Sequence, residues 1–219
     1  MPTFAENYRE ADLTFDENGI YWVNPEDNET YQVMMGWEQP IMNKMAELCV
    51  SEGDDVLEIG FGRGYSAFCM AKAMCDHGID GKITTVDPNF NEQFLNQLTQ
   101  IFPKIWFDKI DFVAATSDQY FEENPDKKYD FIYIDGDHTY HAVKKDWENS
   151  KDKFKKALLF DDYHLPTKES GPGIQCAELI DTIEDESKEL IIMDRRIFPD
   201  NRGYTDEEID YGQVLLTKE

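Results

Sequence analysis

The chain has 219 residues, a length that suits one domain with a substantial hydrophobic core. Apolar residues make up 41% of it and aromatic residues 13%, which argues against an intrinsically disordered chain despite a mean hydropathy of −0.62. Asp and Glu number 46 against 21 Lys and Arg, so the formal net charge is −25 and the pI is about 4.3. A surface this acidic repels nucleic acid and anionic membranes, and we expect neither as a partner.

The sequence also predicts where the protein resides. No apolar run approaches the roughly 20 residues of a membrane-spanning helix, and the amino terminus lacks the basic-then-apolar order of a secretory signal. The four cysteines form no Cys-x-x-Cys pair, and three of them lie in apolar, helix-like stretches, as reduced thiols commonly do. We therefore expect a cytoplasmic protein, and the sequence is compatible with a homo-oligomer.

The first 37 residues differ from the rest of the chain. Residues 1–30 are acidic, dotted with aromatic side chains and aperiodic, and we interpret residues 1–37 as an N-terminal arm or lid. The remaining residues, 38–219, are predicted to form a single domain. Apolar positions at helical spacing predict that this domain opens with a helix over 38–50.

Short apolar runs then alternate with helix-like segments. The runs that we predict as strands are 56–59, 83–86, 110–114, 131–134, 157–160, 190–193 and 214–216. The segments that we predict as helices are 64–77, 91–101, 117–123, 139–152 and 174–187. This alternation predicts an α/β fold with a Rossmann-like, doubly wound sheet of about seven strands, mostly parallel, whose last two strands form an antiparallel pair at the edge. In such sheets, ligands bind beyond the carboxyl ends of the strands.

A glycine-rich loop follows the first strand of this sheet. Its glycines, Gly60, Gly62 and Gly64, allow a sharp turn and let backbone N–H groups approach a ligand closely. The second strand ends at Asp87, where a carboxylate can bind both hydroxyls of a ribose. Glu58 precedes the loop and would repel a pyrophosphate but attract a cationic amino-acid group. The pattern therefore favours a nucleoside cofactor other than a dinucleotide.

Three acids and a histidine follow the fourth and fifth strands. Asp135 and His138 come after the fourth strand, and Asp161 and Asp162 come after the fifth. If these strands are neighbours, the three acids converge, and a divalent cation would relieve their mutual repulsion. Oxygen ligands of this kind suit Mg²⁺, Mn²⁺ or Ca²⁺. The imidazole of His138 can take up a proton near neutral pH.

The chain resembles the class I S-adenosylmethionine-dependent methyltransferases in the segments DDVLEIGFGRG, TTVDPN and VAATSDQYF. The residues that the resemblance implies for cofactor binding are Glu58, Gly60, Gly62, Gly64, Asp87, Thr116, Ser117 and Asp135. Within this set, Asp87 would hold the ribose, and Thr116 and Ser117 would contact the adenine.

Two further segments, YIDGDHTYHAVKKDW and LLFDDYH, narrow the resemblance. They are similar to the metal-dependent small-molecule O-methyltransferases of the macrocin- and cephalosporin-tailoring type, which are distantly related to catechol O-methyltransferases. This likeness implies that Asp135, Asp161 and Asp162 bind the metal and that His138 is the catalytic base. The implied reaction transfers a methyl group from S-adenosylmethionine to a hydroxyl of a sugar, diol or catechol.

Other functions stay open on the residues alone. His138, His164 and an aspartate can surround iron in a metal-dependent oxygenase. A nicotinamide-dependent dehydrogenase and a non-catalytic S-adenosylmethionine-binding protein are also compatible with the glycine loop. Residues 34–38 resemble the entrance segment of the O-methyltransferases named above, and residues 165–173 border the predicted crevice and are a candidate lid.

Overall fold

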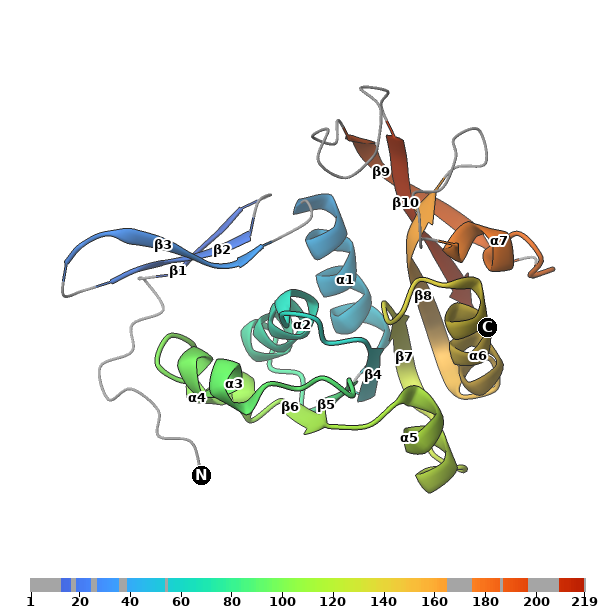
Figure 1. Ribbon diagram of the computed structural model, residues 1–219, viewed down its shortest axis with the longest axis horizontal. Helices are drawn as coiled ribbons and strands as arrows, with labels where there is room; N and C mark the ends of the chain where they lie inside the picture. Colours follow the sequence, from blue (N-terminus) through green and yellow to red (C-terminus); the bar gives the residue numbers. More distant parts are fainter. Residues whose placement is uncertain are drawn as a thin grey trace.

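A computed structural model of the protein describes residues 13–16, 19–24, 27–35, 39–53, 55–164, 175–185, 187–196 and 209–218 (Figure 1). In these ranges seven strands form one sheet, in the order β6-β5-β4-β7-β8-β10-β9. Its strands are β4 (Asp55–Ile59), β5 (Lys82–Val86), β6 (Ile110–Val113), β7 (Tyr129–Ile134), β8 (Phe154–His164), β9 (Glu189–Arg196) and β10 (Ile209–Thr217).

The sheet is mostly parallel. Strand β4 pairs in parallel with β5 and β7, and β5–β6 and β7–β8 are parallel pairs as well. Strand β10 is antiparallel to both β8 and β9. The predicted doubly wound α/β fold is thus confirmed, and so is the antiparallel pairing of the last two strands. The final strand of the chain lies inside the sheet, and β9 forms the edge.

Helices cover both faces of this sheet (Figure 1). They are α1 (Gln39–Glu52), α2 (Tyr65–Asp76), α3 (Glu92–Leu98), α4 (Lys104–Phe107), α5 (Ser117–Glu123), α6 (Tyr140–Ser150) and α7 (Cys176–Ile180). Along β7, Phe131 and Tyr133 pack with α1 and α2, whereas Ile132 and Ile134 pack with α5, α6 and α7. Burial on both faces explains why β7 reads as a nearly continuous apolar run instead of alternating. None of the helices built from the described residues has the length and apolar character of a membrane span.

Strand β8 is longer than the sequence predicts. The prediction ends at residue 160, where the parallel partner β7 also ends, since Ile134 is paired with Phe160. Strand β10 continues to pair with β8 as far as His164 and so extends it. As a result, Asp161 and Asp162 lie within a strand instead of after one. The helix predicted over 91–101 ends at Leu98 and is followed by the short α4.

Residues 13–35, for which the sequence predicts no regular structure, form a small antiparallel sheet in the order β1-β2-β3. Its strands are β1 (Leu13–Asp16), β2 (Gly19–Val23) and β3 (Thr30–Met35). Ile20 of β2 is completely buried in the core cluster that contains α1 and α2. Between this sheet and α3 lies a cavity of about 400 Å³, lined by Trp22, Asn24, Tyr31, Phe94, Gln97, Leu98 and Ile101.

Candidate active site

The glycine loop lies at the carboxyl edge of the sheet, between β4 and α2. Gly60 has a φ of 95°, and a Cβ there would lie 2.0 Å from the carbonyl oxygen of Asp135. Gly64 has a φ of 82°, and a Cβ there would lie 2.4 Å from the ring of Phe61. Both positions therefore require glycine. At Gly60 the reason is that the loop packs directly on the residue that follows β7.

Asp87, the predicted ribose-binding acid, contacts this loop. Its Oδ2 accepts hydrogen bonds from the backbone N–H groups of Phe61 and Gly62, at 3.1 and 3.2 Å. Its Oδ1 accepts one from the N–H of Asn89 at 2.7 Å. The adjacent strands β4 and β5 thus bring the loop and Asp87 together, as the sequence predicts for two parts of one cofactor site.

Glu58 lies in β4, two residues before Gly60, and is fully buried. Its carboxylate accepts hydrogen bonds from the hydroxyls of Ser66 and Thr85, the latter at 2.5 Å. Burial raises the pKa of Glu58 to about 7, against the effect of the two hydrogen bonds. These hydrogen bonds connect β4 to β5 and to the start of α2, directly after the loop.

Thr116 and Ser117 stand at the start of α5, beyond the carboxyl end of β6. Thr116 caps the helix: its hydroxyl accepts from the N–H of Gln119 at 3.3 Å, and the Gln119 side chain accepts from the N–H of Thr116 at 3.0 Å. The Ser117 hydroxyl donates to Asp146 of α6. The end of β6 adjoins Asp87, whose N–H donates to the carbonyl of Val113 at 3.1 Å. The strand end that precedes both residues is therefore next to the predicted ribose site.

A β-bulge interrupts β8 at the acidic pair. Strand β10 places Gly212 opposite Tyr163 and Val214 opposite Phe160, so Gln213 alone faces Asp161 and Asp162. Asp162 has a φ of 53°, in the left-handed region that non-glycine residues seldom adopt. In a regular strand, successive side chains point to opposite faces, and a bulge changes this alternation. The bulge directs Asp162 toward the loop that follows β7.

Asp162 meets His138 there, with 2.9 Å between its Oδ2 and Nδ1 of the imidazole. One ligand atom from each of Asp135, His138 and Asp162 lies within 4.8 Å of the other two, and all three residues are partly exposed. With Nδ1 donating to a carboxylate, Nε2 of His138 is the nitrogen that can accept a proton. The hydrogen bond to Asp162 raises the pKa of His138.

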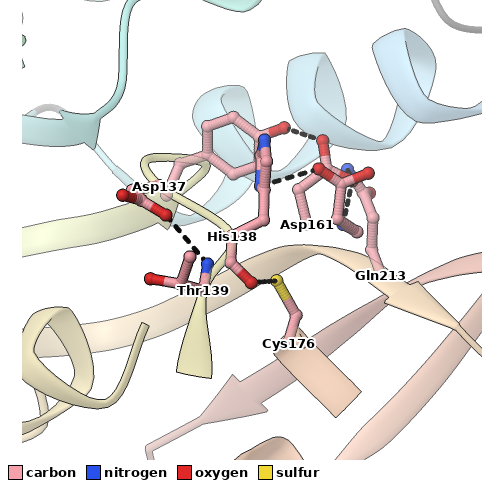
Figure 2. A network of polar contacts seen from close by, with 8 residues as sticks. Asp137, His138, Thr139, Asp161, Cys176 and Gln213 are labelled. Atoms are coloured by element: carbon pink, nitrogen blue, oxygen red, sulfur yellow. Dashed lines mark hydrogen bonds and ion pairs between the residues drawn. The ribbon is translucent and has the colours of Figure 1, made fainter. Parts of the chain in front are cut away.

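Asp161 lies beside this cluster but makes different contacts (Figure 2). It accepts hydrogen bonds from the Tyr133 hydroxyl, from the N–H of Asp162 at 2.9 Å, and from Nε2 of Gln213 at 3.3 Å. Burial, followed by the charge of Asp162, raises the pKa of Asp161 to about 6. Of the three acids predicted to bind metal, the structure gathers two around His138 and turns the third toward β7 and β10.

The three acids lie close together and repel one another. Burial, together with the charges of Asp161 and Asp162, raises the pKa of Asp135 well above its usual range. In the described part of the chain, no lysine or arginine forms an ion pair with these three acids. Two carboxylates and an imidazole within reach of one point fit a divalent cation, whose charge would relieve the repulsion.

The backbone of His138 is held by the residues that open α7. Its carbonyl accepts from the N–H of Gln175 at 2.7 Å and lies 3.9 Å from the thiol of Cys176 (Figure 2). Sequence reasoning did not identify these two residues, nor Tyr133 and Gln213. No spacing links them to the acids. The one available signal is a polar Gln213 directly before the apolar run of the last strand.

Some of the predicted surroundings lie outside the described residues. The predicted entrance segment is described only as far as Met35, and residues 165–173 are not described. The backbone of His164 ends β8, but its side chain is outside the description. The entrance, the lid and any role of His164 stay predictions.

Comparison with known proteins places this geometry in context. The sequence of residues 57–163 matches a protein family described as "Methyltransferase domain". No curated protein sequence matches the chain.

Several solved structures have a similar fold. An O-methyltransferase from Bacillus cereus, solved in complex with SAH, is 14% identical with a TM-score of 0.56, over 83% of this chain and 82% of that one. A putative O-methyltransferase from Klebsiella pneumoniae is 12% identical with a TM-score of 0.59, over 82% and 79%. A putative caffeoyl-CoA O-methyltransferase from Staphylococcus aureus is 18% identical with a TM-score of 0.53, over 83% and 84%.

The family match begins in β4 and ends in the bulged part of β8, so it contains the glycine loop, Asp87 and all three acids. The similar structures extend over more than four-fifths of the chain and therefore include the sheet and its helices. Residues 57–163 thus match a methyltransferase-domain family, and the fold around them is similar to that of solved O-methyltransferases.

Proposed function

We propose that the protein transfers the methyl group of S-adenosylmethionine to a hydroxyl oxygen of a small molecule at the edge of the sheet. The observation that carries this proposal is the packing of Gly60 on the carbonyl of Asp135. This contact makes the glycine loop and the cluster of Asp135, His138 and Asp162 direct neighbours. A methyl donor on the loop and an acceptor at the cluster would therefore face each other, and holding two reactants in this way is itself a large part of catalysis.

The residues of the cluster have separate roles in this proposal. Asp135 and Asp162 would hold a divalent cation, Mg²⁺ by preference, with Mn²⁺ or Ca²⁺ as the other candidates. The cation would act as a Lewis acid and lower the pKa of the acceptor hydroxyl. His138 would accept the hydroxyl proton on Nε2, while Asp162 keeps the imidazole in the required tautomer. Asp161 would keep the bulge in place through Tyr133 and Gln213.

The names of the similar proteins support this class of reaction. O-methyltransferases recur among them, and two were solved with SAH or SAM bound. A sugar, diol or catechol offers a hydroxyl of the required kind, and the net charge of −25 disfavours nucleic acid as the acceptor. We place the reaction in the cytoplasm, on the sequence features described above.

Cofactor binding is the first test. S-adenosylhomocysteine at about 100 times its dissociation constant should stabilise the protein by about 2.7 kcal/mol, whereas NAD⁺ should leave the melting temperature unchanged. Differential scanning fluorimetry measures both. Stabilisation by NAD⁺ alone would favour a dehydrogenase and contradict the proposal.

Metal-dependent methyl transfer is the second part of the test. The protein is incubated with S-adenosylmethionine carrying a radiolabelled methyl group and with a catechol, a vicinal diol or a hydroxy-sugar. Excess chelator should abolish the transfer and added Mg²⁺ should restore it, because in this proposal the cation held by Asp135 and Asp162 lowers the pKa of the acceptor hydroxyl. Asp162→Asn should need more Mg²⁺ for the same rate. Full activity in excess chelator would show that no metal takes part.

A further inference from the structure

Asp146 of α6 is a buried carboxylate to which the proposed mechanism gives no role. Only 5% of it is exposed, and among the described residues Glu58 is the other buried acid. It shares the inward side of α6 with Val143 and Ser150, which are also buried. Because an ionisable group on such a face costs free energy unless it is paired, its partners indicate why it is there.

Asp146 contacts residues that follow the carboxyl ends of two strands, β6 and β7. Its Oδ1 accepts a hydrogen bond from the hydroxyl of Ser117, at the start of α5 beyond β6. Its Oδ2 lies 3.3 Å from the position that a Cβ on Gly136 would take, in the turn beyond β7. Asp146 thus lies between the predicted adenine-contacting residue and the loop that carries Asp135 and His138. Burial raises its pKa to about 6, so the carboxylate is mostly ionised at pH 7 and above.

An ionised carboxylate determines which way the Ser117 hydroxyl points. A serine hydroxyl has one proton to donate and two lone pairs that can accept. Since the proton of Ser117 is committed to Asp146, the partly exposed oxygen of Ser117 offers only lone pairs to a ligand. It can accept a hydrogen bond from an amino group, and it would repel a keto oxygen.

We propose that Asp146 makes Ser117 an obligate hydrogen-bond acceptor and thereby selects a 6-aminopurine over a 6-ketopurine in the nucleoside part of the cofactor. The proposal rests on the proposed function, because it takes Ser117 as the residue that meets the base. The position of Ser117 supports this, since the end of β6 is hydrogen-bonded to Asp87, the predicted ribose-binding acid. Asp146 acts only through Ser117 and is a positioning residue.

The test compares S-adenosylhomocysteine with S-inosylhomocysteine, which carries a keto oxygen in place of the amino group. Dissociation constants are measured by isothermal titration calorimetry on the full chain. The wild type should bind the adenosyl compound about tenfold more tightly, which is the effect of one satisfied hydrogen bond against one mismatched pair. The ratio of the two constants is the readout, because a general loss of stability weakens both compounds alike.

Four variants locate the source of this preference. Ser117→Ala and Asp146→Ala should each reduce the ratio to within about twofold, because the first removes the acceptor and the second frees the hydroxyl to donate. Asp146→Asn retains an oxygen that can accept from Ser117, and it should retain most of the preference. Ser150→Ala is the matched control on the same helix, because the Ser150 hydroxyl is buried and has no hydrogen-bond partner among the described residues. It should leave the ratio unchanged.

The outcomes separate this inference from the proposed function. Failure of the wild type to bind either compound would overturn both. Binding with no preference, or a full preference in Asp146→Ala, would overturn only the role of Asp146. Asp146→Leu removes the same acceptor while filling the buried position, so it decides the question if the alanine variant does not fold.

Discussion

His138 is the residue with the most specific predicted effect on the reaction. Replacing it with alanine removes the proton acceptor, so kcat should fall by about 10²- to 10⁴-fold, whereas the dissociation constant of S-adenosylhomocysteine should change by less than about twofold. His141, exposed in the first turn of α6 and three residues further along the chain, is the matched control. Its alanine variant should behave as the wild type. Equal losses of turnover and cofactor affinity in His138→Ala would contradict the assignment of the base.

The same residue predicts a pH dependence. Only the neutral imidazole can accept a proton, and the hydrogen bond to Asp162 raises the pKa of His138 above its ordinary value of 6.5. Turnover at saturating substrate should therefore rise with pH through an apparent pKa above 6.5. In Asp162→Asn that apparent pKa should move down, because the carboxylate no longer stabilises the imidazolium.

The positions of single residues were predictable where those residues belong to a motif that is short in sequence. Asp87 and the glycines are spaced by one strand–helix unit, and the structure brings them into contact. The orientation of Asp161 was not predictable, because it depends on Gln213, which is 52 residues away in the chain. Similarly, Ser117 carries no sign in the sequence that its hydroxyl is committed to Asp146.

At the scale of elements, the glycine loop connects the two halves of the site, and two of its glycines provide a matched test. In Gly60→Ala the new Cβ would collide with the backbone of Asp135, so the loop must move away from the acid cluster. We expect a loss of about 3 kcal/mol in the free energy of unfolding and at least about tenfold in affinity for S-adenosylhomocysteine. Urea denaturation and calorimetry measure these two quantities.

Gly62→Ala is the control for this substitution. Gly62 also has a positive φ, of 52°, but a Cβ there would meet nothing within 4 Å. Only the left-handed backbone is strained, at a cost of about 1 kcal/mol. Wild-type cofactor affinity in Gly60→Ala would show that the packing of this loop on Asp135 is not needed for binding.

Strands buried on both faces were predictable because they read as continuous apolar runs with turns between them. The small sheet of residues 13–35 was not, because its short strands share acidic, aromatic-rich sequence with the turns that join them. The β-bulge was also beyond prediction. It arises from pairing with β10, and although aspartate adopts a left-handed backbone more often than most residues, it does so too rarely for the sequence to indicate it.

At the scale of the whole molecule, the main electrostatic feature is an excess of acidic residues, some of which are buried. The net charge of −25 destabilises the compact state through self-repulsion, which salt screens. Burial adds to this by raising the pKa of Glu58 to about 7 and those of Asp146 and Asp161 to about 6. In the folded protein, ionising these three buried acids therefore costs free energy, and Glu58 is only partly ionised at neutral pH.

These shifts determine how stability depends on pH. A carboxyl whose pKa is raised on folding binds more protons in the folded state, so stability falls as pH rises from the unfolded to the folded pKa. The pKa of His138 is also raised on folding, so the contribution of His138 to stability is likewise lost as the pH rises. Between pH 6 and pH 8 the free energy of unfolding of the metal-free protein should therefore fall by about 2 kcal/mol, as the raised pKa values of Glu58, Asp146 and Asp161 imply. Carboxyls with lowered pKa values, such as Asp118, titrate below this window and do not oppose the trend.

Urea denaturation at pH 6, 7 and 8, with chelator present, measures this slope. Glu58→Gln removes the group whose pKa of about 7 lies inside the window and keeps an oxygen for Ser66 or Thr85, so its slope should be shallower than that of the wild type. Added salt should raise stability most at pH 8, where the charge is greatest, but it should not remove the difference between wild type and Glu58→Gln, because a buried group is screened little. A metal-free protein that is more stable at pH 8 than at pH 6 would mean that the buried acids are stabilised by interactions stronger than their desolvation.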